Sequence, residues 1–248
     1  MPLRKWRVKM QPNRNTIYNM DCMDVLREMS DGCVDCIVTD PPYPVTPHGN
    51  SRKSMINGEW QSNASRKGKI FEDNDIDIAD YLPELYRVLR DRAHCYIMVN
   101  NLNLTHFLQV IDDSEFNFVK CLIWDKCRQL PSRYYMGCFE YIIFMRKGGE
   151  FPIKEFNTPD ILKVPVTKTK FGDKTIHYTE KPTSLLEVLI RNSTEKGELV
   201  LDPFMGSGST ALAAKMCGRD YIGAEINTEY YNNALEKINL FSAQTQLF

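Results

Sequence analysis

The chain has 248 residues, of which 43% are hydrophobic and 25% charged, and its formal net charge at pH 7 is −1. This length and composition predict a globular protein that buries a sizeable core without disulfides or metal staples. They exclude a membrane-spanning class, because no apolar run approaches the roughly 20 residues that cross a bilayer, and no signal-peptide core follows the basic N-terminus. We therefore expect a soluble, cytoplasmic protein.

Short apolar runs alternate with amphipathic stretches along the chain. The apolar runs are rich in β-branched and aromatic residues and predict strands at 33–38, 94–99, 119–124, 140–145, 198–202 and 220–225. The amphipathic stretches predict helices at 22–29, 78–90, 102–111, 182–193, 209–217 and 228–240. Pro182 suits the first turn of the fourth helix, and Gly218 suits the end of the fifth. This alternation is typical of an open, mostly parallel α/β sheet.

Two long segments interrupt the alternation. Residues 44–70 are polar, basic and rich in Gly, Ser and Asn, and residues 146–176 are irregular and carry several lysines. Irregular segments of this length inside one domain are usually functional. The basic charge is concentrated in residues 1–14 and 50–70. Since the total charge is near zero, these two basic segments indicate a local rather than a global attraction for nucleic acid.

Cys33 and Cys36 form a single C-x-x-C within a predicted strand. Metal binding is one interpretation, but no second pair or suitably spaced histidine accompanies them. Residues three apart on a strand also point to opposite faces. We therefore expect two small buried side chains, no metal site, and reduced thiols throughout.

Two predicted strands end in an acid followed by an unusual turn. "TDPPYP" (39–44) contains prolines that suit a strand end, but its acid and its aromatic are not needed for that purpose. "LVLDPFMGSGST" (199–210) leads through glycines into a helix, so a ligand can approach its backbone closely. No lysine follows these glycines, which excludes the common phosphate-loop motif. Glu225 closes the next strand, where a carboxylate can hold ribose hydroxyls or cap the following helix.

Taken together, these segments resemble those of the S-adenosylmethionine-dependent amino-methyltransferases that act on DNA. "DPPY" (40–43) is similar to the catalytic tetrapeptide of that family, and "DPFMGSGST" (202–210) to its cofactor loop. Further similar segments are "NMDCMDVLREM" (19–29), "RVLR" (87–90), "IWDK" (123–126), "FEYIIF" (139–144) and "HYTEKP" (177–182). The resemblance covers nearly the whole chain, in the motif order of the family's β group. It implies one domain, residues 1–248, with a doubly wound, Rossmann-like, mostly parallel seven-stranded sheet, helices on both faces and the last strand antiparallel.

The resemblance also implies roles for individual residues. Asp40 and the Pro41 carbonyl would accept the two N–H bonds of a target amine, Pro42 would stiffen the loop, and Tyr43 would stack on a flipped base. S-adenosylmethionine would lie against Asp40 and against residues of the other segments: Asp21 and Cys22 near the adenine, Lys181, Phe204, Gly206, Ser207 and Gly208 near the methionine end, and Glu225 and Asn227 near the ribose. Asp202 would either bind the cofactor amine or orient the loop.

Duplex DNA is the implied partner, contacted by the loop 44–70 and by a target-recognition insert at 146–176. The candidate contacts are Arg52, Lys53, Trp60, Arg66, Lys67, Lys168 and Lys170. Trp60 could equally pack beneath its loop. Phe139 and Tyr141 are expected to be strand aromatics, one of which could approach the base. His177 is expected in a loop or packing role, because a methylated amine loses its proton readily without a dedicated base.

The expected activity is methylation of adenine N6 at specific sites in duplex DNA. Cytosine N4 is the first alternative, since "DPPY" also occurs in cytosine enzymes of this motif order. RNA or protein-amide methylation is a second, although those families usually carry Asn where this chain has Asp40. A non-catalytic nucleic-acid-binding module is a third. A homodimer and a partner restriction endonuclease are further expectations.

Overall fold

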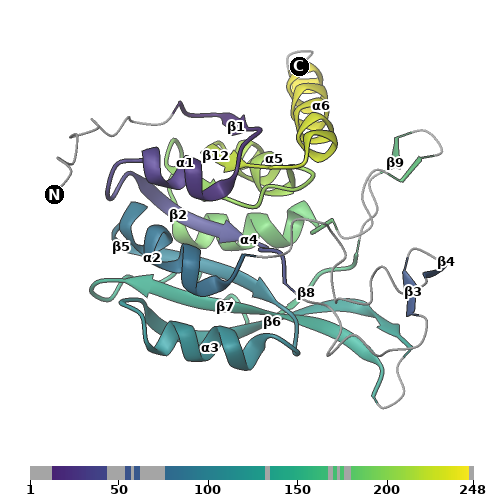
Figure 1. Ribbon diagram of the computed structural model, residues 1–248, viewed down its shortest axis with the longest axis horizontal. Helices are drawn as coiled ribbons and strands as arrows, with labels where there is room; N and C mark the ends of the chain where they lie inside the picture. The colour runs from purple at the N-terminus through teal and green to yellow at the C-terminus, as the bar shows by residue number, and fades with distance from the viewer. Residues whose placement is uncertain are drawn as a thin grey trace, which may run out of the picture.

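The structure is a computed structural model that describes residues 13–43, 76–131, 135–166 and 180–245, together with the backbone of four short strands between them. At its centre lies one sheet with the strand order β1-β12-β11-β2-β5-β7-β6-β8 (Figure 1). Its strands are β1 (Thr16–Tyr18), β2 (Val34–Thr39), β5 (Leu89–Val99), β6 (Asn117–Leu130), β7 (Gly137–Lys147), β8 (Ile161–Lys163), β11 (Leu199–Asp202) and β12 (Asp220–Ala224).

All neighbours in this sheet are parallel except β7, which runs antiparallel to both β5 and β6. The doubly wound, mostly parallel fold is thereby confirmed, with eight strands instead of seven. The expectation that the last strand is antiparallel is wrong, because β12 is parallel to both β1 and β11 and the antiparallel strand is β7. The six predicted strands are present. β1 and β8 were not predicted, because three residues are too few to show a periodicity.

The segment 146–176, expected to be irregular, is therefore partly ordered in the sheet. β8 pairs in parallel with β6, with Ile161 opposite Ile123. Two small antiparallel hairpins also occupy segments expected to be irregular. They are β3 (Ser54–Ile56) with β4 (Glu59–Gln61), and β9 (Lys170–Phe171) with β10 (Lys174–Thr175).

Helices cover both faces of the sheet. Those packed in one core are α1 (Cys22–Glu28), α2 (Ile78–Val88) and α3 (Leu104–Asp112), and those in the other are α4 (Thr183–Ser193), α5 (Ser209–Met216) and α6 (Thr228–Thr245). Figure 1 shows α1, α2 and α3 on the near face of the sheet and α4 and α5 on the far face. α2 illustrates why these segments form helices that cover the sheet. Asp77 and Asp80 form a capping box at its start, and all its buried residues lie on one side of the helix.

Helix boundaries differ from the sequence prediction by one or two residues, and α6 extends five residues further, to Thr245. α2 ends at Val88 because Leu89 is already extended and pairs with Val34 in the sheet. Pro182 is the N-cap residue of α4 and not part of its first turn. Gly218 terminates α5 as predicted, with a φ of 69° and its N–H bonded to the carbonyl of Lys215.

All eight cysteines are free. Cys36 is buried in β2, and burial raises the pKa of its thiol to about 12, which fits the packing interpretation of the C-x-x-C. Among the residues described, no helix is long and apolar enough to cross a membrane.

Candidate active site

Asp40 and Asp202 follow two adjacent parallel strands. β2 pairs with β11 through Cys36 opposite Val200 and Ile37 opposite Leu201, so both strands end at the same edge of the sheet. β12 lies on the far side of β11, whereas β5 lies on the far side of β2. The strand order therefore reverses here, and such a switch point is where α/β sheets bind ligands. The predicted juxtaposition of the two motifs is confirmed.

A cavity of about 670 Å³ opens at this edge. Its volume falls within the roughly 300–1,000 Å³ typical of small-molecule sites. Nearly all the residues predicted for catalysis or cofactor binding line it: Asp21, Cys22, Asp40, Pro41, Pro42, Tyr43, Lys181, Asp202, Phe204, Gly206, Ser207, Glu225 and Asn227. Gly208 is the one predicted residue that does not.

The two glycines of the loop serve different purposes. Gly206 has a φ of 54°, and a Cβ placed there would meet no atom within 4 Å, so its backbone is open to a ligand. Gly208 has a φ of 80°, and a Cβ there would come within 2.8 Å of the Ala234 Cβ. Gly208 is therefore needed for close packing of α6 against the start of α5.

Asp202 uses both carboxylate oxygens within the protein. Oδ1 accepts hydrogen bonds from the Thr39 hydroxyl (2.7 Å) and the Phe204 amide (3.1 Å), and Oδ2 accepts one from the Thr210 hydroxyl (2.6 Å). Burial raises the pKa of Asp202 to about 6, against the opposing effect of these bonds. Of the two roles left open by the sequence, this arrangement favours orienting the loop.

Glu225 connects the glycine loop to the start of α6. Its Oε2 accepts a hydrogen bond from the Gly206 amide (2.8 Å), and its Oε1 accepts one from the Asn227 amide (2.8 Å). The cap of α6 is Asn227, whose Oδ1 accepts bonds from the amides of Glu229 and Tyr230. The Asn227 side chain therefore caps α6, and Glu225 binds the backbone N–H of this cap residue. Glu225 also holds the loop at the cavity wall.

Asp21 is the N-cap of α1 and accepts a hydrogen bond from the Met23 amide (2.8 Å). Cys22 follows it, largely buried, and burial raises the pKa of its thiol to about 12, so the thiol stays neutral. This places a helix N-terminus and an uncharged side chain at the same wall of the cavity.

The tetrapeptide lies between the cavity and the core. The Tyr43 hydroxyl donates to Asp40 Oδ1 over 3.4 Å, and its ring meets Phe107 edge-on with centroids 6.3 Å apart. Burial raises the pKa of Tyr43 well above its ordinary value, so the phenol remains neutral. Tyr43 thus both lines the cavity and packs on the core, which combines the two interpretations of this residue.

Asp40 belongs to a cluster of four alternating charges. The Lys181 ammonium binds Asp40 Oδ2 and lies 3.7 Å from Glu140 Oε2, while Lys126 binds Glu140 Oε1 at 2.5 Å. Lys181 was expected near the methionine end of the cofactor, and the structure places it on Asp40.

Burial and pairing compete at each member of this cluster. Burial raises the pKa of Asp40, and Glu140 adds to this effect, against the attraction of Lys181. Burial opposes the charged form of Lys181, but the two carboxylates outweigh it and raise its pKa. Burial likewise opposes the charge on Glu140, but Lys181 and Lys126 outweigh it and lower its pKa.

A second ion pair lies behind the glycine loop. Lys237 of α6 binds Glu180, and the side chains of both are 5% exposed. The Ser209 hydroxyl donates to Glu180 Oε1 (3.1 Å), and the Lys237 ammonium lies 3.3 Å from the Ser207 hydroxyl. This pair braces the loop against α6.

Sequence reasoning assigned no role to several residues that line the cavity. The polar and aromatic ones are Asn100, Trp124, Lys126, Arg128, Glu140, Glu180, Ser209, Thr210 and Tyr230. A signal existed for six of them, because Trp124 and Lys126 lie in "IWDK", Glu140 in "FEYIIF", Glu180 in "HYTEKP", and Ser209 and Thr210 in "DPFMGSGST". The motifs marked the segments without saying which side chains face the site.

The predicted DNA contacts largely fall outside the described residues. These are Arg52, Lys53, Arg66, Lys67 and Lys168, and the same holds for His177. Trp60 lies in β4 and Lys170 in β9, whose side chains are not described. Phe139 and Tyr141 pack edge-on against each other in β7, with centroids 5.2 Å apart, and neither lines the cavity.

This fold and this site define a class I methyltransferase, with a glycine loop and an Asp-Pro-Pro-Tyr turn at the switch point of the sheet. A family model described as DNA methylase matches residues 34–236. The chain therefore belongs to this family of S-adenosylmethionine-dependent DNA amino-methyltransferases, which methylate adenine N6 or cytosine N4.

Curated relatives cover most of the chain. It is 30% identical to the type II methyltransferase M2.MboI of Moraxella bovis over 233 residues, 86% of this chain and 84% of that protein. It is 27% identical to the type II methyltransferase M2.DpnII of Streptococcus pneumoniae over 248 residues, 91% of this chain and 90% of that protein.

Two solved structures illustrate the shared fold. The complex of M1.HpyAVI with S-adenosylmethionine superposes with a TM-score of 0.66 at 22% identity, covering 89% of this chain and 98% of that chain. The PvuII DNA methyltransferase, which is cytosine-N4-specific, has a TM-score of 0.68 at 16% identity, covering 90% of this chain and 86% of that chain.

Proposed function

We propose that this protein transfers a methyl group from S-adenosylmethionine to N6 of a flipped adenine in duplex DNA. The observation that carries the proposal is the single cavity that joins the Asp40–Tyr43 turn to the glycine loop. An acceptor for an amine and a cradle for a nucleoside cofactor then lie side by side, as methyl transfer to nitrogen requires.

The cavity residues fit the cofactor. Gly206 exposes its backbone to open space, and Glu225 offers a carboxylate next to it for ribose hydroxyls. Asp21 and Cys22 would hold the adenine, and Phe204 and Ser207 the methionine end. When bound, the cofactor supplies an electrophilic methyl group on a sulfonium.

The chain's own residues would act on the amine. Asp40 and the Pro41 carbonyl would accept its two N–H bonds, so that the nitrogen lone pair turns toward the methyl group. The nitrogen becomes cationic as its bond to carbon forms and the carbon–sulfur bond breaks, and the Asp40 carboxylate stabilises that charge. The methylated nitrogen then loses its proton readily to water, without a dedicated base.

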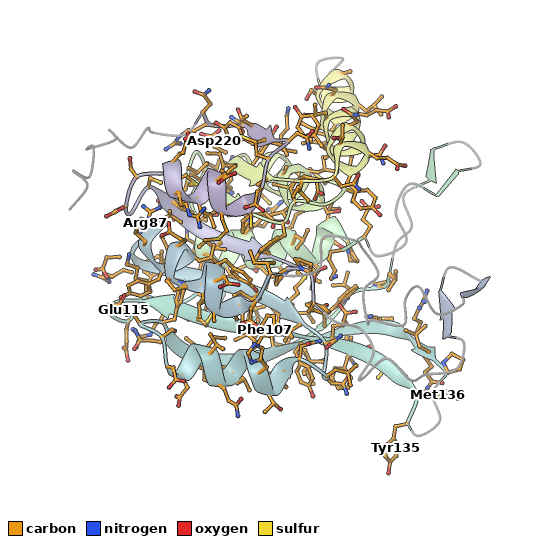
Figure 2. All side chains as sticks on the ribbon, in the orientation of Figure 1. Arg87, Phe107, Glu115, Tyr135, Met136 and Asp220 are labelled. Carbon is orange, nitrogen blue, oxygen red and sulfur yellow. The ribbon has the colours of Figure 1, made fainter. Side chains whose placement is uncertain are left out.

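A hairpin beside the cavity is a further candidate for DNA contact. Tyr135 is 94% exposed and Met136 58% exposed, and Figure 2 shows both at the end of the β6–β7 ribbon. On the same ribbon, Arg128 and Leu130 line the cavity. A cation at the rim and exposed apolar side chains beyond it suit a partner that is both anionic and able to stack.

The product of the reaction tests this proposal. Unmethylated plasmid DNA is incubated with the protein and S-adenosylmethionine, digested to nucleosides, and analysed by mass spectrometry. We expect N6-methyladenine. The fold likeness to a cytosine-N4-specific enzyme makes N4-methylcytosine the second candidate, and its appearance would overturn the adenine assignment.

The remaining alternatives and associations are tested in parallel. Transfer to RNA or to protein in place of DNA would replace the DNA assignment, and a failure to bind S-adenosylmethionine in calorimetry would favour a non-catalytic module. A homodimer, a partner restriction endonuclease and a cytoplasmic location remain predictions, checked by sedimentation, by genome neighbourhood and by cell fractionation.

A further inference from the structure

Asp40 is engaged by a cation in the free protein. Lys181 binds its Oδ2, and among the described residues the contact to Oδ1 is the long 3.4 Å one from the Tyr43 hydroxyl. The proposed function requires Asp40 to accept an N–H of the amine and to offset a positive charge that develops on that nitrogen. An ammonium already bound to the same carboxylate weakens both actions, because it cancels the charge that Asp40 would supply.

Glu140 offers that ammonium another partner. Its Oε1 binds Lys126 at 2.5 Å, whereas its Oε2 is buried and accepts no hydrogen bond from any residue that the structure describes. The Lys181 ammonium lies 3.7 Å from this oxygen. A buried charged oxygen without a hydrogen bond is unfavourable, so Glu140 has a site that is incomplete in this state.

We propose that Lys181 moves from Asp40 to Glu140 when the target amine enters, so that Glu140 is a positioning residue for the reaction. The proposal rests on the function proposed above and deepens it. The amine replaces Lys181 as the donor to Asp40, and Lys181 completes the bond that Glu140 Oε2 lacks. No bond to carbon changes and no proton moves in this step.

The surroundings of Lys181 suit such a short movement. Its side chain is only 11% exposed, and its ammonium lies 6.0 Å from the centre of the Trp124 ring. Lys126 lies 5.2 Å from the same ring and holds Glu140 from the other side. Glu140 therefore stays in place while the flexible lysine swings between two carboxylates along one wall of the cavity.

The exchange leaves the charges better distributed for methyl transfer. Before it, each carboxylate accepts a hydrogen bond from one lysine, Asp40 from Lys181 and Glu140 from Lys126. After it, Glu140 has both lysines and Asp40 faces the amine alone. The developing cation then meets an uncompensated carboxylate in a partly desolvated site, where such an interaction is strongest.

Glu140→Gln tests the exchange, because the amide keeps the shape and removes the charge. We expect the single-turnover rate of methyl transfer to fall about tenfold to a hundredfold, the effect of one hydrogen bond to a charged group. S-adenosylmethionine affinity by calorimetry and affinity for plasmid DNA should change less than threefold. The matched control is Glu115→Gln, an exposed glutamate that Figure 2 shows at the opposite end of the sheet from Met136. A wild-type rate in Glu140→Gln would overturn the proposal.

A double-mutant cycle separates the exchange from a purely structural role. In a Lys181→Met background Asp40 is already free, so adding Glu140→Gln should slow the reaction no further. If Glu140→Gln slows the reaction by the same factor in both backgrounds, Glu140 acts without Lys181 and the proposal is wrong. Absence of methyl transfer by the wild-type protein would instead overturn the proposed function.

A ternary structure provides a readout that does not depend on turnover. The wild-type protein is crystallised with sinefungin and a duplex that carries the site found by sequencing methylated plasmid DNA. We expect the Lys181 ammonium within hydrogen-bonding distance of Glu140 Oε2 and no longer on Asp40. A retained contact between Lys181 and Asp40 in that complex would overturn the proposal, even if a variant failed to fold.

Discussion

Two aspartates at neighbouring strand ends have opposite environments. Asp202 is buried, and its oxygens are saturated by two hydroxyls and one amide. Asp40 retains 29% exposure of its side chain and binds a lysine that has a second carboxylate nearby. The first arrangement holds three segments of chain together, whereas the second leaves a charge available to a ligand. Residue type alone does not distinguish a brace from a reacting group.

Asp40→Ala should separate binding from chemistry. Because Asp40 is proposed to contact the amine, we expect S-adenosylmethionine affinity in calorimetry to stay within about threefold. Methyl transfer, measured with a tritiated methyl donor, should fall by about 10² to 10⁴, the usual contribution of a positioned acid or base. Retention of full turnover would show that the Asp40 carboxylate is not the catalytic group.

Asp202→Asn should change the pH dependence of stability. With a native pKa of about 6 and an ordinary value of 3.8, the buried carboxyl favours folding below pH 3.8, and this contribution is lost as the pH rises to 6. The variant lacks this loss, so its stability relative to wild type should rise by about 2 kcal/mol between pH 4 and pH 7.

Urea unfolding across this pH range measures the difference between the two proteins. A difference independent of pH would contradict the assigned pKa. Asp202→Asn also tests whether Asp202 binds the cofactor, because the amide oxygen can still accept the hydrogen bonds from the Thr39 hydroxyl and the Phe204 amide. Strong loss of S-adenosylmethionine binding would favour the alternative in which Asp202 binds the cofactor amine.

At the scale of elements, the site is assembled from strand ends and held by helix starts. The residues at the N-caps of α1, α5 and α6 are Asp21, Gly208 and Asn227. α6 packs so closely on the start of α5 that a Cβ at Gly208 would collide with Ala234. The β6–β7 ribbon differs from these elements because its far end carries exposed side chains and lies outside the two cores.

Tyr135→Ala and Met136→Ser test the ribbon as a DNA contact. If these side chains meet DNA, the dissociation constant for a fluorescent duplex should rise about tenfold for Tyr135→Ala, the contribution of one stacking aromatic. S-adenosylmethionine binding should be unchanged, since neither residue lines the cavity. Phe156→Ala is the matched control, an aromatic that is 78% exposed elsewhere on the surface. Equal loss in the control would show that the effect is not specific to the ribbon.

At the scale of the whole molecule, the cavity draws on both ends of the chain. Asp21 is near the N-terminus, Asp40 follows β2, and Tyr230 lies in α6. β1 also closes one edge of the sheet by pairing with β12, so the terminal segments are joined directly. A ligand in this cavity therefore contacts elements that separate only when the domain unfolds.

S-adenosylmethionine should accordingly stabilise the entire domain. At a concentration 100 times its dissociation constant, the gain is about 2.7 kcal/mol. For a chain of this size the melting temperature should rise by about 5–10 °C in one cooperative transition. Methionine alone serves as the control ligand. A melting temperature unchanged by S-adenosylmethionine would contradict the cofactor assignment to this cavity.

Much of this protein could be predicted from local patterns. The apolar runs marked six of the eight sheet strands, and the alternation with helices indicated the parallel α/β class, because strand burial and helix amphipathicity are properties of short windows. The motif order indicated the family and most of the cavity lining. β1 and β8 could not be found in this way, since three residues acquire strand geometry only from their neighbours.

What the sequence determined by itself was which residue types stand at the ends of β2, β11 and β12, and hence which chemistry the site can contain. Only the tertiary structure decided that Lys181 lies on Asp40, that Glu140 has an unsatisfied oxygen beside it, and that Gly208 packs on α6 while Gly206 faces the cavity. The physical reason is that charge pairing and close packing depend on distances between segments far apart in the chain. Those distances exist only once the sheet has brought the segments together.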